Sequence, residues 1–336
     1  MNPLKLNERQ QTILDKIVQL YILKGSPIGS RTLSKYLEEA SKLSPATLRN
    51  IMSDLEEMDF ISHPHTSAGR IPTDKGYRFY VDHLNNIQLI SDEMIKNVEN
   101  EISISGREAA FQKASKLLGL LSHSLSFIKL PGLADMLIKK IDIISLSSAK
   151  ILVVLALESD IVKTLTIETY FEYKEKQLTQ LARYINEKIA GKKLSFLQTS
   201  YHEIMQDSNI NDLPLVRLFV ESIEDIIESN KTKLITYGTQ NLLDSTQNEE
   251  IIKIKSVIEL IEEEDIIIHI LDKVPENLSV VIGKEIGHNI LEDYAFIKEN
   301  YTVSSSSGTI GIIGPKRMNY PVLMALVKSF SEILSE

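Results

Sequence analysis

The sequence predicts an α+β protein of several domains that begins with a winged helix-turn-helix. Three observations support this prediction. The chain has 336 residues, which favours two or three domains over one. Residues 1–85 carry the pattern of three helices followed by a β-hairpin, and farther along the chain β-rich segments stand on both sides of a mostly helical stretch.

The first two helices have clear boundary signals. Asn7 is a good N-cap, and Gln10 three residues later completes a capping box. Apolar residues then recur at helical spacing from Ile13 to Tyr21, until Gly25-Ser26-Pro27 ends the helix. A short second helix is expected from about Ser30 to Leu37.

The third helix should begin at Pro45, because a serine N-cap, Ser44, precedes a proline at the first helical position. It should end at about Met58. One of its faces is apolar and should be buried: Leu48, Ile51, Met52, Leu55 and Met58. The opposite face should be exposed and carries Thr47, Arg49, Asn50 and Ser53.

Two short strands follow the third helix. Phe60-Ile61 and Arg70-Ile71 flank a loop rich in Pro, Ser and Gly at residues 63–69. This order of helix, helix, helix and hairpin is that of a winged helix-turn-helix, in which a recognition helix enters the major groove of DNA.

The rest of the chain alternates between helical and β patterns. Thr73 should cap a further helix, and a helical pattern with breaks continues from residue 90 to about residue 127. Later helices are expected at residues 177–189, 214–227, 248–264 and 319–334. Strands are expected at residues 141–146, 151–157, 161–168, 266–271, 280–282, 301–304 and 309–313. We expect one sheet that draws strands from both sides of an insert at about residues 177–262.

The charge balance permits DNA binding. The net charge is −9, but residues 1–85 hold eleven Lys and Arg against ten Asp and Glu, so the acidic excess lies in the rest of the chain. A near-neutral domain binds DNA if its basic side chains share one face. The N-terminus has no apolar signal-peptide core, and the longest purely apolar run, Ile151 to Leu157, is too short to span a membrane. A cytoplasmic location is therefore expected.

Blocks at both ends of the chain carry specific motifs. They are Ser44 to Asn50 with Leu55 to Glu57, then Pro64 to Thr73 with Gly76 to Arg78, and finally Gly311 to Tyr320. In this order they resemble the recognition-helix segment, the wing with its following helix, and the C-terminal signature of the HrcA family of heat-inducible repressors. Three positions depart from that pattern: Asp59 stands where the family often has glycine, Ile51 where it often has an acidic residue, and Ile286 where it often has asparagine.

The resemblance implies an architecture and a function. It implies a winged-helix DNA-binding domain at residues 1–85, a GAF-like α/β domain at 86–176 and 263–336, and a mostly helical, dimerising insert at 177–262. It further implies a homodimer that represses chaperone operons at an inverted repeat called CIRCE, is released on heat and has the chaperonin as a modulator.

The candidate DNA contacts are polar and basic side chains of the N-terminal domain. Arg49 can bond a guanine edge and Asn50 an adenine edge, both through two hydrogen bonds. Arg31 and Thr32 open the second helix, where backbone N–H groups also meet phosphate. The complete set is Arg31, Thr32, Thr47, Arg49, Asn50, Ser53, His63, His65, Thr66, Arg70, Lys75 and Arg78.

Other classes of function find little support. Cysteine is absent, and the His63-Pro-His65 spacing has no carboxylate or thiolate near it in sequence, so it makes a poor metal site. The spacing of Gly308, Gly311 and Gly314 is wrong for a phosphate-binding loop and favours turns in a sheet. No serine-hydrolase elbow or zinc-protease motif occurs. The sequence thus predicts neither an enzyme nor a cofactor. One alternative stays open: a winged-helix regulator controlled by a small molecule in the GAF-like domain.

Overall fold

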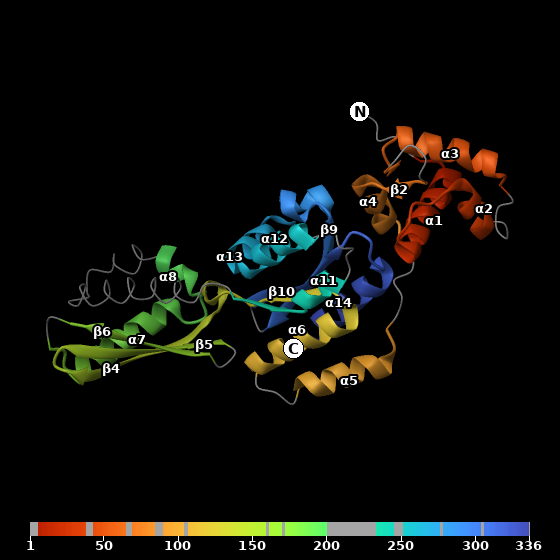
Figure 1. Ribbon diagram of the computed structural model, residues 1–336. Helices are drawn as coiled ribbons and strands as arrows, with labels where there is room; N and C mark the ends of the chain where they lie inside the picture. Colours follow the sequence, from red (N-terminus) through yellow and green to blue (C-terminus); the bar gives the residue numbers. More distant parts are fainter. Residues whose placement is uncertain are drawn as a thin grey trace. The chain divides into compact units, whose positions relative to one another are not determined.

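The computed structural model describes residues 6–37, 43–64, 69–84, 90–103, 107–158, 161–169, 172–199, 233–244, 251–275, 278–303 and 306–335. The chain divides into two compact units, each built from segments far apart in sequence (Figure 1). The first unit contains Met1–Phe127, Thr236–Glu299 and Ile310–Phe330, and the second contains Ile128–Ile235, Asn300–Thr309 and Ser331–Glu336.

The N-terminal part of the first unit is a winged helix-turn-helix, as predicted, and is called the head below. Its elements are α1 (Glu8–Lys24), α2 (Ser30–Leu37), α3 (Pro45–Glu57), β1 (Ile61–Ser62), β2 (Ile71–Pro72) and α4 (Asp74–Asp82). The predicted caps are confirmed: Asn7 and Gln10 form a capping box, Ser44 caps α3, and Gly25 ends α1 with a left-handed φ of 66°. These signals are local, so they act wherever the rest of the chain lies.

The core of the head is made by its three first helices. Leu48, Met52 and Leu55 of α3 are buried, whereas Ile51 and Met58, which the pattern also placed inside, are half-buried. They pack with buried residues of α1 and α2, among them Leu14, Ile17, Val18 and Leu33.

The rest of the first unit is called the body and is organised on a five-stranded sheet in the order β7-β3-β10-β9-β8. The strands are β3 (Leu125–Lys129), β7 (Leu234–Tyr237), β8 (Val280–Ile282), β9 (Tyr294–Val303) and β10 (Ser306–Pro315). The helices of this region are α5 (Asp92–Ser103), α6 (Arg107–Ser122), α11 (Thr239–Asp244), α12 (Ile251–Glu262), α13 (Glu264–Lys273) and α14 (Tyr320–Leu334). Short 3-10 turns are η4 (Gly283–Ile286) and η5 (Asn289–Leu291).

Two predicted elements of the body are wrong. Residues 266–271 were expected to form a strand but belong to α13, where Ile267, Ile270 and Leu271 are buried at helical spacing. A short apolar run fits a buried helix as well as a strand, and only the tertiary packing decides between them. The helical pattern expected as far as residue 127 ends with α6 at Ser122, and Leu125 begins the buried strand β3.

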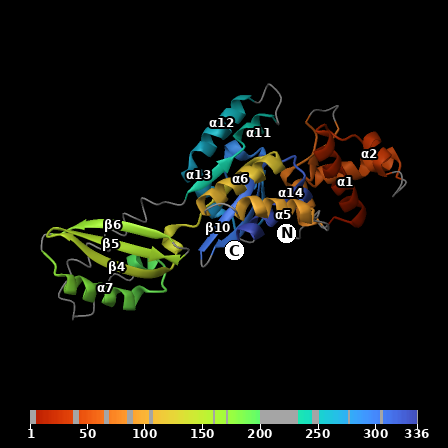
Figure 2. The ribbon, with the colours of Figure 1, turned by 90° about the horizontal axis from the view of Figure 1, so that it is seen from below.

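The second unit contains its own antiparallel sheet, β4-β5-β6. The strands are β4 (Ile138–Ser147), β5 (Lys150–Leu157) and β6 (Val162–Glu168), and α7 (Glu175–Ile189) covers one face of the sheet (Figure 2). A short helix, α8 (Ser195–Thr199), follows. Alternate residues of β5 are buried toward α7: Ile151, Val153, Leu155 and Leu157.

The prediction of one sheet on both sides of the insert is therefore wrong for residues 138–168. These strands pair locally through short turns, and compactness divides the chain at residue 128 rather than 177. Asn186 of α7 further ties the helix to β4, because its side chain accepts from Ile141 N–H at 2.8 Å and donates to Ile141 O at 2.7 Å. The helix expected at residues 214–227 lies outside the described residues.

Candidate DNA-binding surface

The exposed face of α3 presents the residues expected to read DNA. Thr47, Arg49, Asn50 and Ser53 are all exposed, while the buried stripe of the same helix faces the core. The Ser44 hydroxyl accepts the Thr47 N–H at 3.1 Å and lies 3.0 Å from the Thr47 hydroxyl. This cap fixes the first turn of the helix, and with it the rotation that points Arg49 and Asn50 outward.

The side chains of Arg49 and Asn50 have no hydrogen bond or ion pair to any other residue that the structure describes. The first turn of α3 contains no acidic residue, so the positive end of the helix dipole is not neutralised by its own side chains. The exposed side chains of Arg49 and Asn50 therefore lie close to a helix N-terminus that favours anions. This arrangement suits the edge of a base pair with a phosphate beside it.

The second helix adds one exposed cation near its start. Arg31 is exposed and, among the described parts of the chain, has no ion-pair partner, whereas Thr32 is half-buried. The first turn of α2 also has no acidic residue. Arg31 thus remains free to meet a phosphate.

The base of the wing is held to α3 by an acidic residue that sequence reasoning did not single out. Arg70 donates from Nε to a Glu56 carboxylate oxygen at 2.8 Å, and its Nη2 lies 2.7 Å from the same oxygen. His63 Nδ1 contacts the other carboxylate oxygen. Burial alone would raise the pKa of Glu56, but hydrogen bonds and charge from His63 and Arg70 outweigh it, and the pKa is lowered.

The backbone of Arg70 also pairs with the segment before α2. Ile28 N–H donates to Arg70 O at 2.8 Å, and Arg70 N–H donates to Ile28 O at 2.9 Å. A Cβ at Gly69 would lie 2.6–2.8 Å from Ile28 backbone atoms, so only glycine permits this approach. His63 and Arg70, predicted as DNA contacts, therefore also hold the wing in place. His65 and Thr66 lie outside the described residues.

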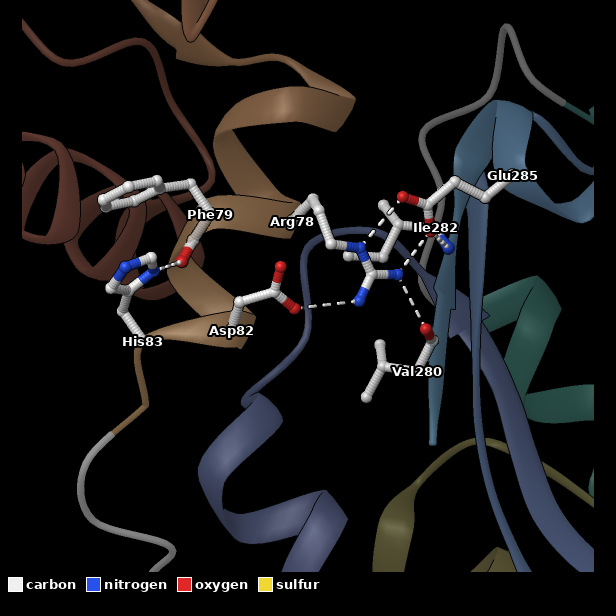
Figure 3. Close-up of polar contacts among 7 residues, drawn as sticks. All are labelled: Arg78, Phe79, Asp82, His83, Val280, Ile282 and Glu285. Carbon is white, nitrogen blue, oxygen red and sulfur yellow. Dashed lines mark hydrogen bonds and ion pairs between the residues drawn. The ribbon is translucent and has the colours of Figure 1, made fainter. Parts of the chain in front are cut away.

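Lys75 and Arg78 bind groups of the protein itself. Lys75 Nζ donates to Met58 O at 2.8 Å and lies 4.4 Å from the centre of the Phe60 ring. Arg78 binds Glu285, Asp82 and Val280 O, as Figure 3 shows. The Lys75 side chain is nevertheless exposed, whereas Arg78 is half-buried. Sequence reasoning had no signal for the pairing of Arg78 with Glu285, because Glu285 stands 207 residues from Arg78.

Asp59 shows why the family often has glycine at this position. Its φ of 61° lies in the left-handed region, which glycine adopts freely and Asp tolerates better than most residues. The Thr73 hydroxyl donates to Asp59 O at 2.7 Å, so this turn leads α3 into the wing and α4.

The glycine-rich C-terminal segment is part of a strand. Gly308, Gly311 and Gly314 lie in β10 itself, not in turns beside it. A Cβ at Gly311 would lie 2.3 Å from Ile297 O and 2.5 Å from the Phe127 ring. Close packing within the sheet, rather than phosphate binding, explains this glycine.

The described residues include no group of three or more His, Cys, Asp or Glu side chains placed to hold a metal ion. None of the helices described is both long and apolar enough to cross a membrane.

The Glu56 cluster makes stability depend on pH. A lowered pKa in the folded state stabilises the fold above the unfolded pKa of about 4.3, and this contribution is lost as pH falls through the folded pKa. We expect Glu56→Gln to lower the free energy of unfolding at pH 7 by up to about 1 kcal/mol. As the pH falls below 5, the free energy of unfolding should fall less in this variant than in the wild type. Thermal unfolding at a series of pH values measures both. Glu57→Gln, an exposed neighbour, is the control, and a wild-type pH dependence in Glu56→Gln would contradict the assignment.

Comparison with known proteins identifies both parts of the chain. Residues 5–85 match the family model described as winged helix-turn-helix transcription repressor, HrcA DNA-binding, and residues 108–324 match the HrcA protein C-terminal domain. A crystal structure described as that of a hypothetical protein, at 25% identity, covers 98% of this chain and 99% of its own with a TM-score of 0.55, which supports the overall fold.

Curated relatives match along the whole chain. The heat-inducible transcription repressor HrcA of Chlorobium phaeobacteroides (strain BS1) is 31% identical over 98% of this chain and 97% of its own length. That of Chlorobium chlorochromatii is 32% identical over 98% of each chain. The repressor of Halalkalibacterium halodurans is 31% identical over 98% of this chain and 97% of its own. These names describe repressors and not enzymes, in agreement with the sequence prediction. The chain belongs to the HrcA family of heat-inducible transcription repressors.

Proposed function

We propose that this repressor binds, as a homodimer, an inverted-repeat operator of the CIRCE type upstream of chaperone operons. The observation that carries the proposal is the exposed face of α3, on which Arg49 and Asn50 have no partner within the described residues. An inverted repeat offers two equal half-sites, and a dimer with two-fold symmetry places one recognition helix in each. The protein would act in the cytoplasm, where the operators are.

The proposed contacts divide into three groups. Arg49 and Asn50 read base edges, with Thr47 and Ser53 beside them. Arg31 and Thr32 meet a phosphate at the start of α2. The wing segment, to which His63, His65, Thr66 and Arg70 belong in sequence, lies along the DNA backbone or in the minor groove. We leave Lys75 and Arg78 out of the set, because their side chains contact other parts of the protein.

The outer face of the β4-β5-β6 sheet supports the proposal of a dimer. Three large apolar side chains are exposed there, at 48% for Ile144, 55% for Leu146 and 58% for Val162. Register places Ile144 beside Leu152, and Val162 beside Ala156. Contiguous exposed apolar surface of this kind marks interaction sites. We propose that a second copy covers this face, which belongs to the same unit as residues 177–235 of the predicted dimerising insert.

Control by heat and chaperonin is the last part of the proposal. The body sheet pairs β3, at residues 125–129, with β10, at residues 306–315. Such non-local pairing folds slowly and leaves strand edges exposed meanwhile, which favours chaperonin dependence. Unfolded proteins that compete for chaperonin would then relieve repression without any ligand.

The small-molecule alternative gains little from the groove that the structure describes. A groove of about 880 Å³ lies against β4 and α7, with Lys140, Ile143 and Asn186 among its lining residues. Its β4 residues lie within the predicted GAF-like range 86–176 and its α7 residues within the predicted insert, so the groove is not a pocket of the GAF-like domain alone. The refolding experiment below separates this alternative from the chaperonin proposal.

Replacing Arg49 tests the recognition face. Arg49→Ala should weaken operator binding by about 1–3 kcal/mol, because a contact to a base through two hydrogen bonds is lost. Mobility shift with the inverted repeat measures the loss, and light scattering checks that the variant remains folded and dimeric. Arg183→Ala, which removes an exposed arginine from the second unit, is the matched control. Wild-type affinity in Arg49→Ala would show that the recognition face is assigned wrongly.

A charge on the apolar sheet face tests the dimer. Ile144→Asp with Val162→Asp should give a monomer at micromolar concentration, because two carboxylates would be buried without partners. Size-exclusion chromatography with light scattering measures the mass. Leu23→Asp, at a side chain that is 74% exposed on α1, is the control and should stay dimeric. If the double variant remains a dimer, the second copy binds elsewhere.

Refolding tests the role of chaperonin. Protein that is heated mildly and then cooled should recover operator binding much better with chaperonin and ATP than with either alone, because slow non-local pairing exposes apolar segments to aggregation. The recovered fraction is measured by mobility shift after a fixed time. Equal spontaneous recovery in all samples would contradict the chaperonin part of the proposal and favour the small-molecule alternative.

A further inference from the structure

Helix α4 of the head contacts the body through Arg78. Its Nε donates to Glu285 Oε1 at 2.9 Å, its Nη2 donates to Val280 O at 2.7 Å, and Nη2 also contacts the second Glu285 oxygen (Figure 3). Val280 begins β8 and Glu285 lies in η4, so one guanidinium binds two neighbouring elements of the body. Asp82, one turn along α4, lies 3.3 Å from Arg78 Nη1 and holds the side chain extended.

A second ion pair stands at the other end of α4. Lys316 Nζ lies 2.7 Å from Asp74 Oδ1, and the Lys284 backbone N–H donates to Asp74 Oδ2 at 3.1 Å. Gly283 makes room for this carboxylate: its φ is 56°, and a Cβ there would lie 2.3 Å from Asp74 Oδ2. Three residues of the body, Gly283, Lys284 and Lys316, thus accommodate or bind Asp74, the first residue of α4.

An aromatic contact fills the space between the two pairs. The rings of Tyr77 and Tyr320 are 6.1 Å apart, and their side chains are buried, which raises the pKa of both phenols. The Tyr320 hydroxyl donates to Lys316 O at 2.7 Å, which ties the ring to the lysine of the second pair. Arg317 lies against Gly25 at the end of α1, where a Cβ would be 2.5 Å from its Nη1.

These ion pairs are partly shielded from water. The exposed fraction of the side chain is 19% for Arg78 and 34% for Glu285, and 24% for Lys316 and 25% for Asp74. Burial alone would lower the pKa of Arg78, but hydrogen bonds and charge from Glu285 and Asp82 outweigh it and raise the pKa. Removing one partner from such a pair leaves the other poorly solvated, which costs more than breaking a fully exposed pair.

We propose that these residues form a latch that fixes the DNA-binding head on the body and so positions it for the operator. The latch consists of Asp74, Tyr77 and Arg78 on α4 with Gly283, Glu285, Lys316 and Tyr320 on the body. Asp74 and Arg78 are positioning residues and do not contact DNA. Lys316 and Tyr320 belong to the C-terminal motif at residues 311–320, so the latch assigns a structural role to part of that motif.

The latch leaves the recognition face open. None of its residues belongs to α3, and the exposed side chains of Arg49 and Asn50 have no hydrogen bond or ion pair with any described residue of the body. A head that is fixed before binding loses less freedom when both half-sites are occupied, so it binds an inverted repeat more tightly and tolerates fewer spacings. This step rests on the proposed function as a dimer on an inverted repeat.

Variants on the body side of the latch separate positioning from DNA contact. Glu285→Gln with Lys316→Met should weaken binding to the full inverted repeat about 10-fold, while binding to DNA with a single half-site stays within about twofold of wild type. The variant should also discriminate less between the natural spacing and repeats that are lengthened or shortened by a few base pairs, measured as the ratio of their affinities. Glu263→Gln with Lys273→Met makes the same changes on exposed body positions away from the head and should change neither affinity.

A readout without DNA tests the latch by itself. The natural chain has no cysteine, so Leu23→Cys gives a single site on the head for a fluorescent label. The anisotropy of this label should decay faster in the latch variant than in the labelled parent and in the control variant. Unchanged decay, unchanged or tighter operator binding, or an equal loss on the single half-site would overturn the proposal. If the parent protein does not bind the inverted repeat, the proposed function is wrong. The anisotropy measurement still tests the latch in that case, because it does not depend on DNA.

Discussion

The burial of Leu48, Met52 and Leu55 sets the rotation of α3, and the DNA-binding surface depends on that rotation. Each of these side chains is at most 5% exposed, and full burial of such a side chain stabilises the fold by about 1.5–3 kcal/mol. Turning the helix would expose all three at once. The face with Arg49 and Asn50 is therefore held outward by packing on the opposite side of the helix, and no contact of its own is needed.

Glu56 extends this control from the helix to the wing. It is on the same helix as the buried stripe and binds Arg70 and His63 at the base of the wing. The rotation that points Arg49 outward also places Glu56 where the wing can bind it. Helix and wing are thus positioned by one packing arrangement, which is why cations that a sequence pattern assigns to DNA also have a role inside the head.

The sequence predicts those features of the head that depend on near neighbours. The Asn7 and Ser44 caps, and the alternation of Leu48 with Arg49, act over three or four residues and fold as their patterns indicate. The partners of Arg78 and Asp74 on the body stand more than 200 residues away. The sequence pattern therefore assigned Arg78, which follows the wing, to a phosphate, whereas the fold pairs it with Glu285.

The strands beyond the head show the same limit. Residues 151–157 are recognised as a strand from their composition, but composition does not say which sheet takes them. Short turns to β4 and β6 favour the local sheet. By contrast, β3 and β10 are neighbours in the body sheet although a long stretch of chain separates them, and no local pattern predicts that pairing. Ile267, Ile270 and Leu271 are equally apolar and form a helix, because the packing surface available to them suits that spacing.

The distribution of charge explains why the position of the head matters for specificity. The chain has a net charge of −9 while residues 1–85 are nearly neutral, and three of the basic residues first assigned to DNA are bound within the protein. Affinity that depends on phosphate neutralisation alone is therefore small, since it grows with the number of cations that reach the backbone. In the proposed dimer, affinity would then depend on the few base contacts of each α3 helix and on both helices being engaged together. The proposed latch would strengthen the second contribution without adding any non-specific attraction to DNA.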